Sequence, residues 1–240
     1  MADESFEVYR AEPEGAPRGG VILIHEIWGL VPHIRNIADR LAAEGYLVLA
    51  PDLLSSAGVT PEIGAELATL MSSPHEDIRN AAQPRLREAT APARSPEFAA
   101  QATARLRGVV DQFESEPGIN GRIAVTGFCF GGTYSFALAA ADPRLKAAVP
   151  FYGTADVTSI PGIACPVLAL YGEQDTRLMD MLPEIERAMS AAHIDFQDHV
   201  YPDAGHAFFN DTNAGAYRPG VAADAWARTL TFLDAHLNAG

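Results

Sequence analysis

The sequence predicts an α/β protein built on a doubly wound, mostly parallel sheet. Short continuous apolar runs, such as 20–24 and 166–171, are typical of strands that are buried on both faces. Segments with apolar residues at helical spacing alternate with these runs along the chain. The 240 residues show neither a repeat nor a second hydrophobic core, so we expect a single domain.

The first half of the chain begins with a weakly alternating segment at 5–10, which predicts an edge strand. The expected elements that follow are strands at 20–24 and 46–50, a helix that carries Ile34, Ile37, Ala38 and Leu41 and stops at Gly45, and helices at 61–71 and 98–113. Because strands and helices alternate, neighbouring strands should run parallel and be joined by right-handed crossovers.

Residues 72–96 interrupt this alternation. The stretch holds four prolines and four arginines, and no apolar periodicity runs through it. Proline removes a backbone donor and disfavours a helical conformation at the residue before it. We therefore expect a loop or short-helix excursion close to the functional site rather than a linker between domains.

The second half of the chain continues the alternation. The expected elements are strands at 122–126, 146–151, 166–171 and 196–201, and helices at 133–141, at 182–192 and at the C-terminus. The last helix carries Trp226, Leu230, Leu233 and Leu237 on one stripe, which predicts a face that docks on the core.

Composition narrows the class of partner. The net charge of −14 argues against nucleic acid and anionic membranes, which both bind clustered basic surface. No secretory signal is visible at the N-terminus, and no apolar run is long enough to span a membrane. Cys129 and Cys165 are the only cysteines and lie in no metal-type cluster, which fits a reducing, cytoplasmic setting. We expect a monomer or a small homo-oligomer.

The pattern Gly-Phe-Cys-Phe-Gly at 127–131 lies between a β-branched run and a segment of small residues. Gly127 and Gly131 remove side chains where a turning backbone must pass close to its neighbours. We expect Cys129 at the tip of a sharp, strained strand–turn–helix with its side chain exposed. The positive end of the following helix favours a thiolate there. A free cysteine is often a small buried hydrophobe instead, so the residues further along the chain decide.

Asp175 and His206 follow Cys129 at the ends of two later predicted strands. Their order is nucleophile, acid, histidine, which belongs to a catalytic triad on this kind of sheet. His206 is expected to take the proton of the nucleophile, and Asp175 to hold the imidazole in the required tautomer. Taken alone, Asp175 is equally a helix N-cap or a loop carboxylate.

Glu26 lies at the end of another predicted strand, where function collects in open α/β sheets. Its neighbour His25 directly follows the apolar run and is expected to pack or cap. The segment is not His-Glu-x-x-His, which excludes a zinc protease of that type, and no glycine-rich phosphate loop with lysine follows a strand. We expect no metal and no organic cofactor.

Four motifs in this order resemble the dienelactone hydrolase (carboxymethylenebutenolidase) family. They are His-Glu-Ile-Trp-Gly-Leu at 25–30, Gly-Phe-Cys-Phe-Gly-Gly at 127–132, Gly-Glu-Gln-Asp at 172–175 and Ala-Gly-His-Ala-Phe at 204–208. The resemblance covers the chain from residue 20 to the C-terminal helix. It implies the α/β-hydrolase fold and hydrolysis of a lactone or small ester through a cysteine thiolate and an acyl-enzyme.

The resemblance also implies roles for individual residues. The implied catalytic residues are Cys129, Asp175, His206 and Glu26. Glu26 would hold the resting thiol and help to release a thiolate when substrate enters. The backbone N–H groups of Ile27 and Phe130 would form the oxyanion hole.

The sequence departs from the family at one substrate contact. In the chlorocatechol-pathway enzymes an arginine four residues after the histidine helps to hold the substrate carboxylate, and here Asn210 stands at that position. The candidates for a second carboxylate-binding arginine are Arg79, Arg85, Arg87 and Arg94. The expected substrate contacts are Trp28, Arg79, Tyr152 and Asn210. We expect weaker preference for carboxylated lactones, unless Asn210 only caps a turn and Arg218 or an arginine of 72–96 binds the anion.

Two alternatives remain open at this point. One is a promiscuous esterase or thioesterase with another substrate. The other is a binding protein that keeps the fold without turnover, although such a protein would be expected to lack a triad residue, and none is missing.

Overall fold

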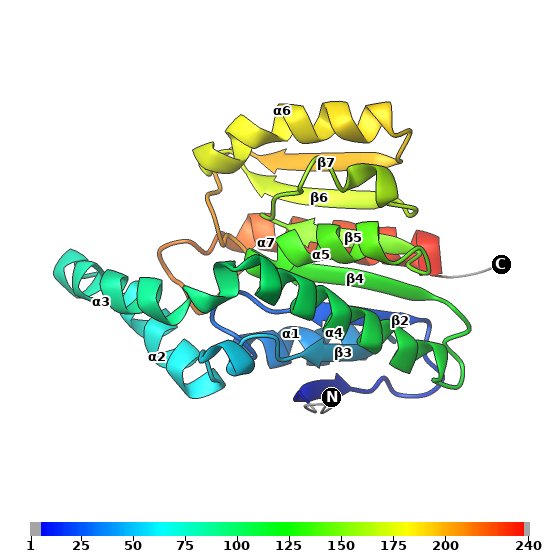
Figure 1. Cartoon of the computed structure of the whole chain (residues 1–240), viewed down its shortest axis with the longest axis horizontal. Coiled ribbons are helices and arrows are strands. Elements are labelled where there is room, and N and C mark those ends of the chain that lie inside the picture. Colours follow the sequence, from blue (N-terminus) through cyan, green and yellow to red (C-terminus); the bar gives the residue numbers. More distant parts are fainter. Residues whose placement is uncertain (1–5, 238–240) are drawn as a thin grey trace.

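In the computed structural model, which describes residues 6–237, seven strands form one sheet in the order β1-β3-β2-β4-β5-β6-β7 (Figure 1). They are β1 (Val8–Ala11), β2 (Gly20–Ile24), β3 (Leu47–Pro51), β4 (Ile123–Phe128), β5 (Ala147–Phe151), β6 (Val167–Gly172) and β7 (Phe196–Tyr201). β1 pairs antiparallel with β3, and all other neighbours are parallel. Every residue of the five inner strands is buried, as their continuous apolar runs predict.

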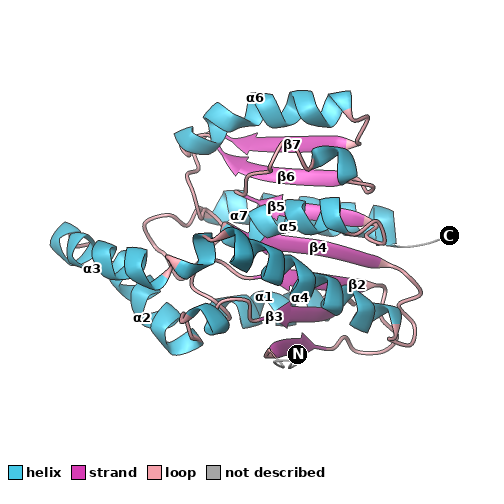
Figure 2. Cartoon of the chain, viewed as in Figure 1, coloured by secondary structure: helices cyan, strands magenta, loops and turns pink. Residues whose placement is uncertain are grey.

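Helices cover both faces of the sheet, which confirms the predicted fold class (Figure 2). They are α1 (Pro32–Ala43), α2 (Pro61–Met71), α3 (Glu76–Ala89), α4 (Pro96–Glu114), α5 (Phe130–Ala141), α6 (Thr176–Ala191) and α7 (Pro219–Leu237), with 3-10 turns η1 (Ser55–Ala57), η2 (Pro92–Arg94) and η3 (Ile160–Gly162). α4 and α5 lie on the near face in Figure 1, and α1 and α7 on the far face. The parallel strands end at the left of that view, where α2 and α3 project.

The segment 72–96 is more regular than expected. It contains α3, a helix of 14 residues with Pro84 inside it. Glu76 and Asp77 in the first turn and Arg87 in the last complement the helix dipole. α3 buries little beyond Ala82, so its sequence does not need a stripe of apolar residues. Without such a stripe, the sequence does not predict this helix.

The helix predicted at 182–192 begins earlier, at Thr176. Asp175 caps it by accepting a hydrogen bond from the Leu178 amide at 3.4 Å, and Pro183 lies inside it. A proline at the second residue of the predicted helix 182–192 is typical of a helix start. The helix in fact starts after its acidic N-cap, Asp175.

The predicted edge strand is shorter than 5–10, because pairing with β3 covers only Val8–Ala11. Its first predicted residue, Ser5, lies outside the described residues. No helix within 6–237 combines the length and the apolar character needed to cross a membrane.

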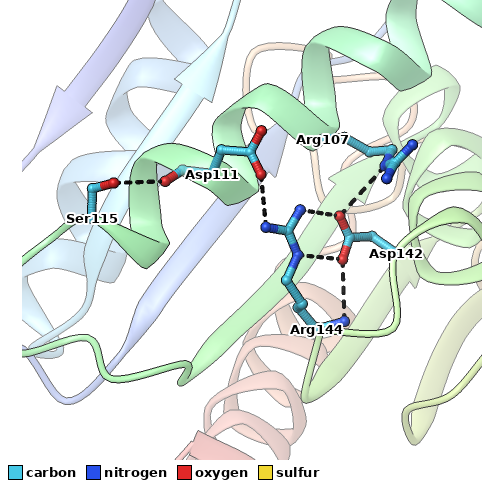
Figure 3. A network of polar contacts seen from close by, with 5 residues as sticks. All are labelled: Arg107, Asp111, Ser115, Asp142 and Arg144. Atoms are coloured by element: carbon cyan, nitrogen blue, oxygen red, sulfur yellow. Dashed lines mark hydrogen bonds and ion pairs between the residues drawn. The ribbon is translucent and has the colours of Figure 1, made fainter.

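A buried carboxylate joins the C-terminal end of α5 to α4 (Figure 3). Asp142 is 1% exposed and accepts hydrogen bonds from the Arg144 side chain, which also reaches Asp111 at 2.7 Å. Arg107 approaches the same carboxylate at 3.7 Å from an exposed position. The hydrogen bonds from Arg144 are the main cause that lowers the pKa of Asp142 below its ordinary value.

Arg144→Met is therefore expected to destabilise the fold by about 2–3 kcal/mol at neutral pH, because the buried carboxylate keeps only the backbone amide of residue 144 and the distant Arg107. Since the folded pKa of Asp142 is depressed, this stabilisation is present above the ordinary carboxyl pKa and is lost as the pH falls through the folded value. Urea unfolding at neutral and acidic pH measures both effects. Arg107→Met is the matched control, with an expected loss below about 1 kcal/mol. A loss in Arg144→Met that stays constant with pH would contradict the argument.

Candidate active site

Cys129 lies at the tip of the turn between β4 and α5, as the sequence predicts. Its backbone has φ 57° and ψ −110°, in a region that residues other than glycine rarely occupy. Such a conformation costs about 1–3 kcal/mol, so the surrounding structure must hold it in place. The Cys129 amide donates to the Phe151 carbonyl at 3.0 Å, which ties the turn to β5. The side chain is partly exposed at the N-terminus of α5.

The two glycines that flank this turn are required by close backbone contacts. A Cβ on Gly127 would lie 2.4 Å from the Gly131 carbonyl oxygen. A Cβ on Gly131 would lie 2.2 Å from the carbonyl oxygen of Ile24, at the end of β2. Both distances are far shorter than any real contact, so the sharp turn exists only with glycine at these positions.

Asp175 and His206 meet beside Cys129, although 31 residues separate them in the chain. The Nδ1 atom of His206 lies 2.5 Å from Oδ2 of Asp175. The other carboxylate oxygen of Asp175 caps α6, so this residue makes both contacts that its position suggested. Burial opposes ionisation of Asp175, but the hydrogen bond with His206 and its charge outweigh this and keep the pKa below the usual value.

The His206 imidazole also interacts with the Cys129 side chain. Burial lowers the pKa of His206, but the hydrogen bonds with Asp175 and Cys129 outweigh this and raise it to about 10. The ring packs against Tyr152, with 5.0 Å between ring centroids. At neutral pH this arrangement favours an imidazolium between a carboxylate and the cysteine sulfur.

Glu26 is buried beneath this group, with 1% of its surface exposed. Burial raises its pKa to about 7, although the charge of His206 and a hydrogen bond from Asn210 act in the opposite direction. The buried hydroxyl of Tyr152 faces this carboxylate without a hydrogen bond of good geometry to any described residue. A buried carboxyl group that titrates near neutral pH is suited to acid–base work.

Asn210 contacts Glu26. Its Nδ2 donates to Oε2 of Glu26 at 2.7 Å, and its Oδ1 accepts from the backbone and hydroxyl of Thr212 at 3.0 and 2.6 Å. Because the Thr212 amide can only donate, the orientation of the Asn210 amide is fixed, and its nitrogen must face Glu26. This pairing was not foreseen, since the two residues are 184 positions apart.

The other expected substrate contacts are dispersed. Trp28 and Asn210 line a cavity of about 200 Å³ between α1 and α2. Tyr152 is buried against His206 and Glu26. Arg79 donates to the Ser73 carbonyl within its own segment.

Among the other arginines of 72–96, the structure distinguishes two. Arg85 forms a pair of hydrogen bonds with Glu66, at 2.6 and 2.7 Å, which occupies its guanidinium. Arg94 instead lines a larger cavity of about 670 Å³ together with Phe130, the residue after Cys129. No pattern in the sequence indicates this cavity, because its lining consists mostly of alanine and other small residues from separate elements.

Two backbone amides are candidates for an oxyanion hole. Phe130 is the first residue of α5, and Ile27 follows Glu26 in the loop after β2. Neither amide donates to the backbone of another described residue. Free N–H groups at a helix start and in a strand-end loop are suited to bind an oxyanion.

His25 has the structural role that its position predicts. It is buried, its Nε2 accepts the Leu53 amide at 3.0 Å, and its ring stacks on Phe130 at 5.6 Å. These contacts hold the loop that carries Glu26 against the start of α5.

Comparisons with known proteins identify the family of the chain. Residues 6–237 match the model of the "Dienelactone hydrolase family". The chain is 36% identical to a "Putative carboxymethylenebutenolidase" of Salmonella typhimurium, over 96% of this chain and 83% of that protein. A protein of the same name from Saccharolobus solfataricus is 33% identical, over 95% of this chain and 93% of its own length.

A solved structure shows the same architecture. The crystal structure titled "Putative Dienelactone Hydrolase" from Klebsiella pneumoniae superposes with a TM-score of 0.79 at 33% identity, over 94% of this chain and 91% of that one. This likeness and the parallel sheet confirm the α/β-hydrolase fold. The chain therefore belongs to the dienelactone hydrolase family, whose members are carboxylic-ester hydrolases.

Proposed function

We propose that this protein hydrolyses small esters or lactones through a Cys129 thiolate and an acyl-enzyme. The observation that carries the proposal is the strained turn that presents Cys129 to His206, which Asp175 holds at 2.5 Å. A helix N-terminus and an adjacent imidazolium are the two surroundings that most favour a thiolate. Strain of this kind, which the surrounding backbone maintains, is typical of functional sites.

In the first half of the reaction, the Cys129 sulfur attacks the ester carbonyl and forms a carbon–sulfur bond. The oxygen that gains negative charge is stabilised by the amides of Ile27 and Phe130, each worth about 3–4 kcal/mol. As the intermediate collapses, the carbon–oxygen bond breaks, and the leaving alkoxide takes a proton from His206. This leaves a neutral imidazole and a thioester on Cys129.

In the second half, neutral His206 takes a proton from water, and the resulting hydroxide attacks the thioester. Collapse of this intermediate breaks the carbon–sulfur bond. It releases the carboxylic acid and restores the thiolate–imidazolium pair. Asp175 keeps its hydrogen bond to Nδ1 in both halves, so the other nitrogen always faces the reacting atoms.

Pre-steady-state hydrolysis of p-nitrophenyl acetate tests the proposal. We expect a burst of p-nitrophenol equal to the amount of enzyme, followed by steady turnover, and an acetyl group on Cys129 in acid-quenched protein. A burst without later turnover would leave a binding protein with a reactive thiol. Steady turnover with no acyl group on Cys129 would contradict the covalent mechanism.

The role of Glu26 gives a pH-dependent prediction. The groups that face its carboxyl group are His206, Asn210 and Tyr152, and its pKa is raised to about 7. If its carboxylate form helps to keep Cys129 a thiolate, by accepting the proton of any thiol that remains, kcat/KM should rise as the pH passes through about 7. Glu26→Gln should lower kcat/KM about 10²-fold and remove that limb of the pH profile. A profile and a rate that do not change would make Glu26 a bystander.

Asn210 bears on the charge of the substrate. An arginine offers two parallel charge-assisted hydrogen bonds to a carboxylate, whereas the amide of Asn210 is neutral and already bound to Glu26. We expect little preference for a carboxylated lactone over its methyl ester, and a gain of about tenfold in that preference in Asn210→Arg. The ratio of the two kcat/KM values measures this. A strong wild-type preference for the anion that survives the substitution would place charge recognition elsewhere, with Arg94 the first position to test.

A further inference from the structure

A groove runs along one face of α5. It is the cavity of about 670 Å³ noted above, and it lies between the start of α4 and the segment that follows β5. Its floor is a single stripe of α5 made by Phe130, Tyr134, Ala137 and Ala141. The spacing of three and four residues places these side chains on one face of the helix. The groove is therefore as long as the helix, about 16 Å at 1.5 Å per residue.

The surface of the groove is mainly apolar. Ala93 and Ala99 form part of the wall on the side of η2 and α4. Charge occurs only on the exposed side chains of Arg94 and Asp156, among the described residues that line it. The Asp156 carboxylate is already bound to the backbone and hydroxyl of Thr158, at 3.0 and 2.8 Å. An apolar chain would thus lie on methyl groups and aromatic edges.

The groove begins at Phe130, one residue after the proposed nucleophile. Phe130 follows Cys129 directly, and Thr133, which also lines the groove, donates its amide to the Cys129 carbonyl at 3.1 Å. The Phe130 ring is held between His25 and Tyr134, at 5.6 and 4.5 Å between centroids, so this end of the groove is fixed in advance.

The α5 groove and the Asp175–His206 pair are built from different parts of the chain. None of the described residues that line the groove comes from 172–210, the part of the chain that supplies Asp175 and His206. A leaving alcohol must lie near His206 to receive its proton. The acyl part, which stays on Cys129, is then directed to the other side, where α5 begins.

We propose that the α5 groove binds the linear acyl chain of the ester, so that the enzyme prefers neutral esters of medium-length acids. This inference rests on the proposed function, because it assigns the chain of an acyl group carried by Cys129. Complete burial of one methylene group changes an affinity by about fourfold. An open groove buries part of that surface, so about twofold for each methylene is expected.

Chain length is the first test. The kcat/KM values for p-nitrophenyl acetate, butyrate, hexanoate and octanoate should rise by about twofold for each methylene, or roughly 60-fold over the series. Ala137→Trp, in the middle of the floor, should lower the ratio of octanoate to acetate at least about tenfold. Ala141 lies one helical turn further along the groove. Ala141→Trp should therefore lower kcat/KM only for esters whose acyl chain extends beyond Ala137. Ala104→Trp is the matched control, because Ala104 is exposed on α4 and does not line the groove; it should keep the wild-type ratio.

A flat chain-length series in the wild type, or equal losses for all esters in Ala137→Trp, would overturn the groove as an acyl site. Hydrolysis of acetate in that case would leave the proposed function standing. A second measurement needs no hydrolysis: methyl and octyl methanethiosulfonate each form a disulfide with the Cys129 thiol and release methanesulfinate. The octyl reagent should label Cys129 faster relative to the methyl reagent in the wild type than in Ala137→Trp. If that holds while no ester is turned over, the groove stands and the proposed function fails; equal ratios would overturn the groove.

Discussion

Replacing Cys129 by alanine is expected to lower kcat/KM for p-nitrophenyl acetate by at least about 10⁴-fold. The thiolate forms the covalent bond of the proposed mechanism, and the amides of Ile27 and Phe130 that remain act only on an attack by water. The fold should be retained, because alanine at φ 57° carries the same backbone strain as cysteine. Equal thermal unfolding of the two proteins would show this.

Two variants separate the thiolate from a general need for a polar side chain. Cys129→Ser keeps a nucleophilic atom at the same place, but a hydroxyl does not ionise beside His206 as a thiol does. We expect it to lie about 10²–10³-fold below the wild type. Cys165→Ala should keep full activity, because Cys165 is buried at the start of β6 and lies in none of the contacts of the site.

Iodoacetamide gives the same distinction without mutation. Burial raises the pKa of Cys165 to about 12, so its thiol should react slowly, whereas Cys129 should be modified first. Peptide mapping against residual activity measures the correspondence. Full activity in protein whose Cys129 is completely alkylated would end the case for a cysteine nucleophile.

The backbone of this site could be predicted from the sequence because its requirements are local. A side chain on Gly127 would collide with the carbonyl oxygen of Gly131, and one on Gly131 with that of Ile24. Only glycine fits such positions, and glycines at this spacing are easily recognised in a sequence. The strands are equally visible, since burial on both faces demands continuous apolar runs. The order of Cys129, Asp175 and His206 follows from the direction of parallel strands, which all end at one edge.

What could not be predicted depends on pairs of residues that are distant in the chain. The hydrogen bond from Asn210 to Glu26 joins two loops, and neither local pattern requires it. Helix α3 is exposed, so it lacks the apolar stripe by which helices are recognised. The α5 groove is lined by small residues of three segments, and a small residue gives the same pattern whether it lines a groove or a core.

The polarity of the site has a consequence for its substrate. Asn210 gives Glu26 one neutral donor instead of a cation, so the carboxyl group keeps a pKa near 7 and loses its charge just below neutral pH. The carboxylate form of Glu26, which the proposed mechanism uses, repels an anionic substrate. A mainly apolar groove along α5 also favours an uncharged ester, so the two features agree.

Asp175→Asn is expected to lower kcat/KM by about 10³–10⁴-fold while leaving the fold almost as stable as before. The asparagine amide donates to Nδ1 of His206, so the neutral imidazole must carry its proton on the nitrogen that faces Cys129. Loss of the carboxylate also removes a hydrogen bond that raises the pKa of His206, so the thiolate loses its charged partner at neutral pH.

Stability distinguishes this effect from the second role of Asp175, which is to cap α6. Asparagine is as good an N-cap as aspartate, whereas alanine loses the bond to the Leu178 amide at a cost of about 1 kcal/mol. Asp175→Asn and Asp175→Ala should therefore lose activity to a similar extent, and only the alanine variant should unfold at lower urea concentration. Activity that instead follows stability, with Asp175→Asn close to the wild type, would mean that the carboxylate acts through the helix alone.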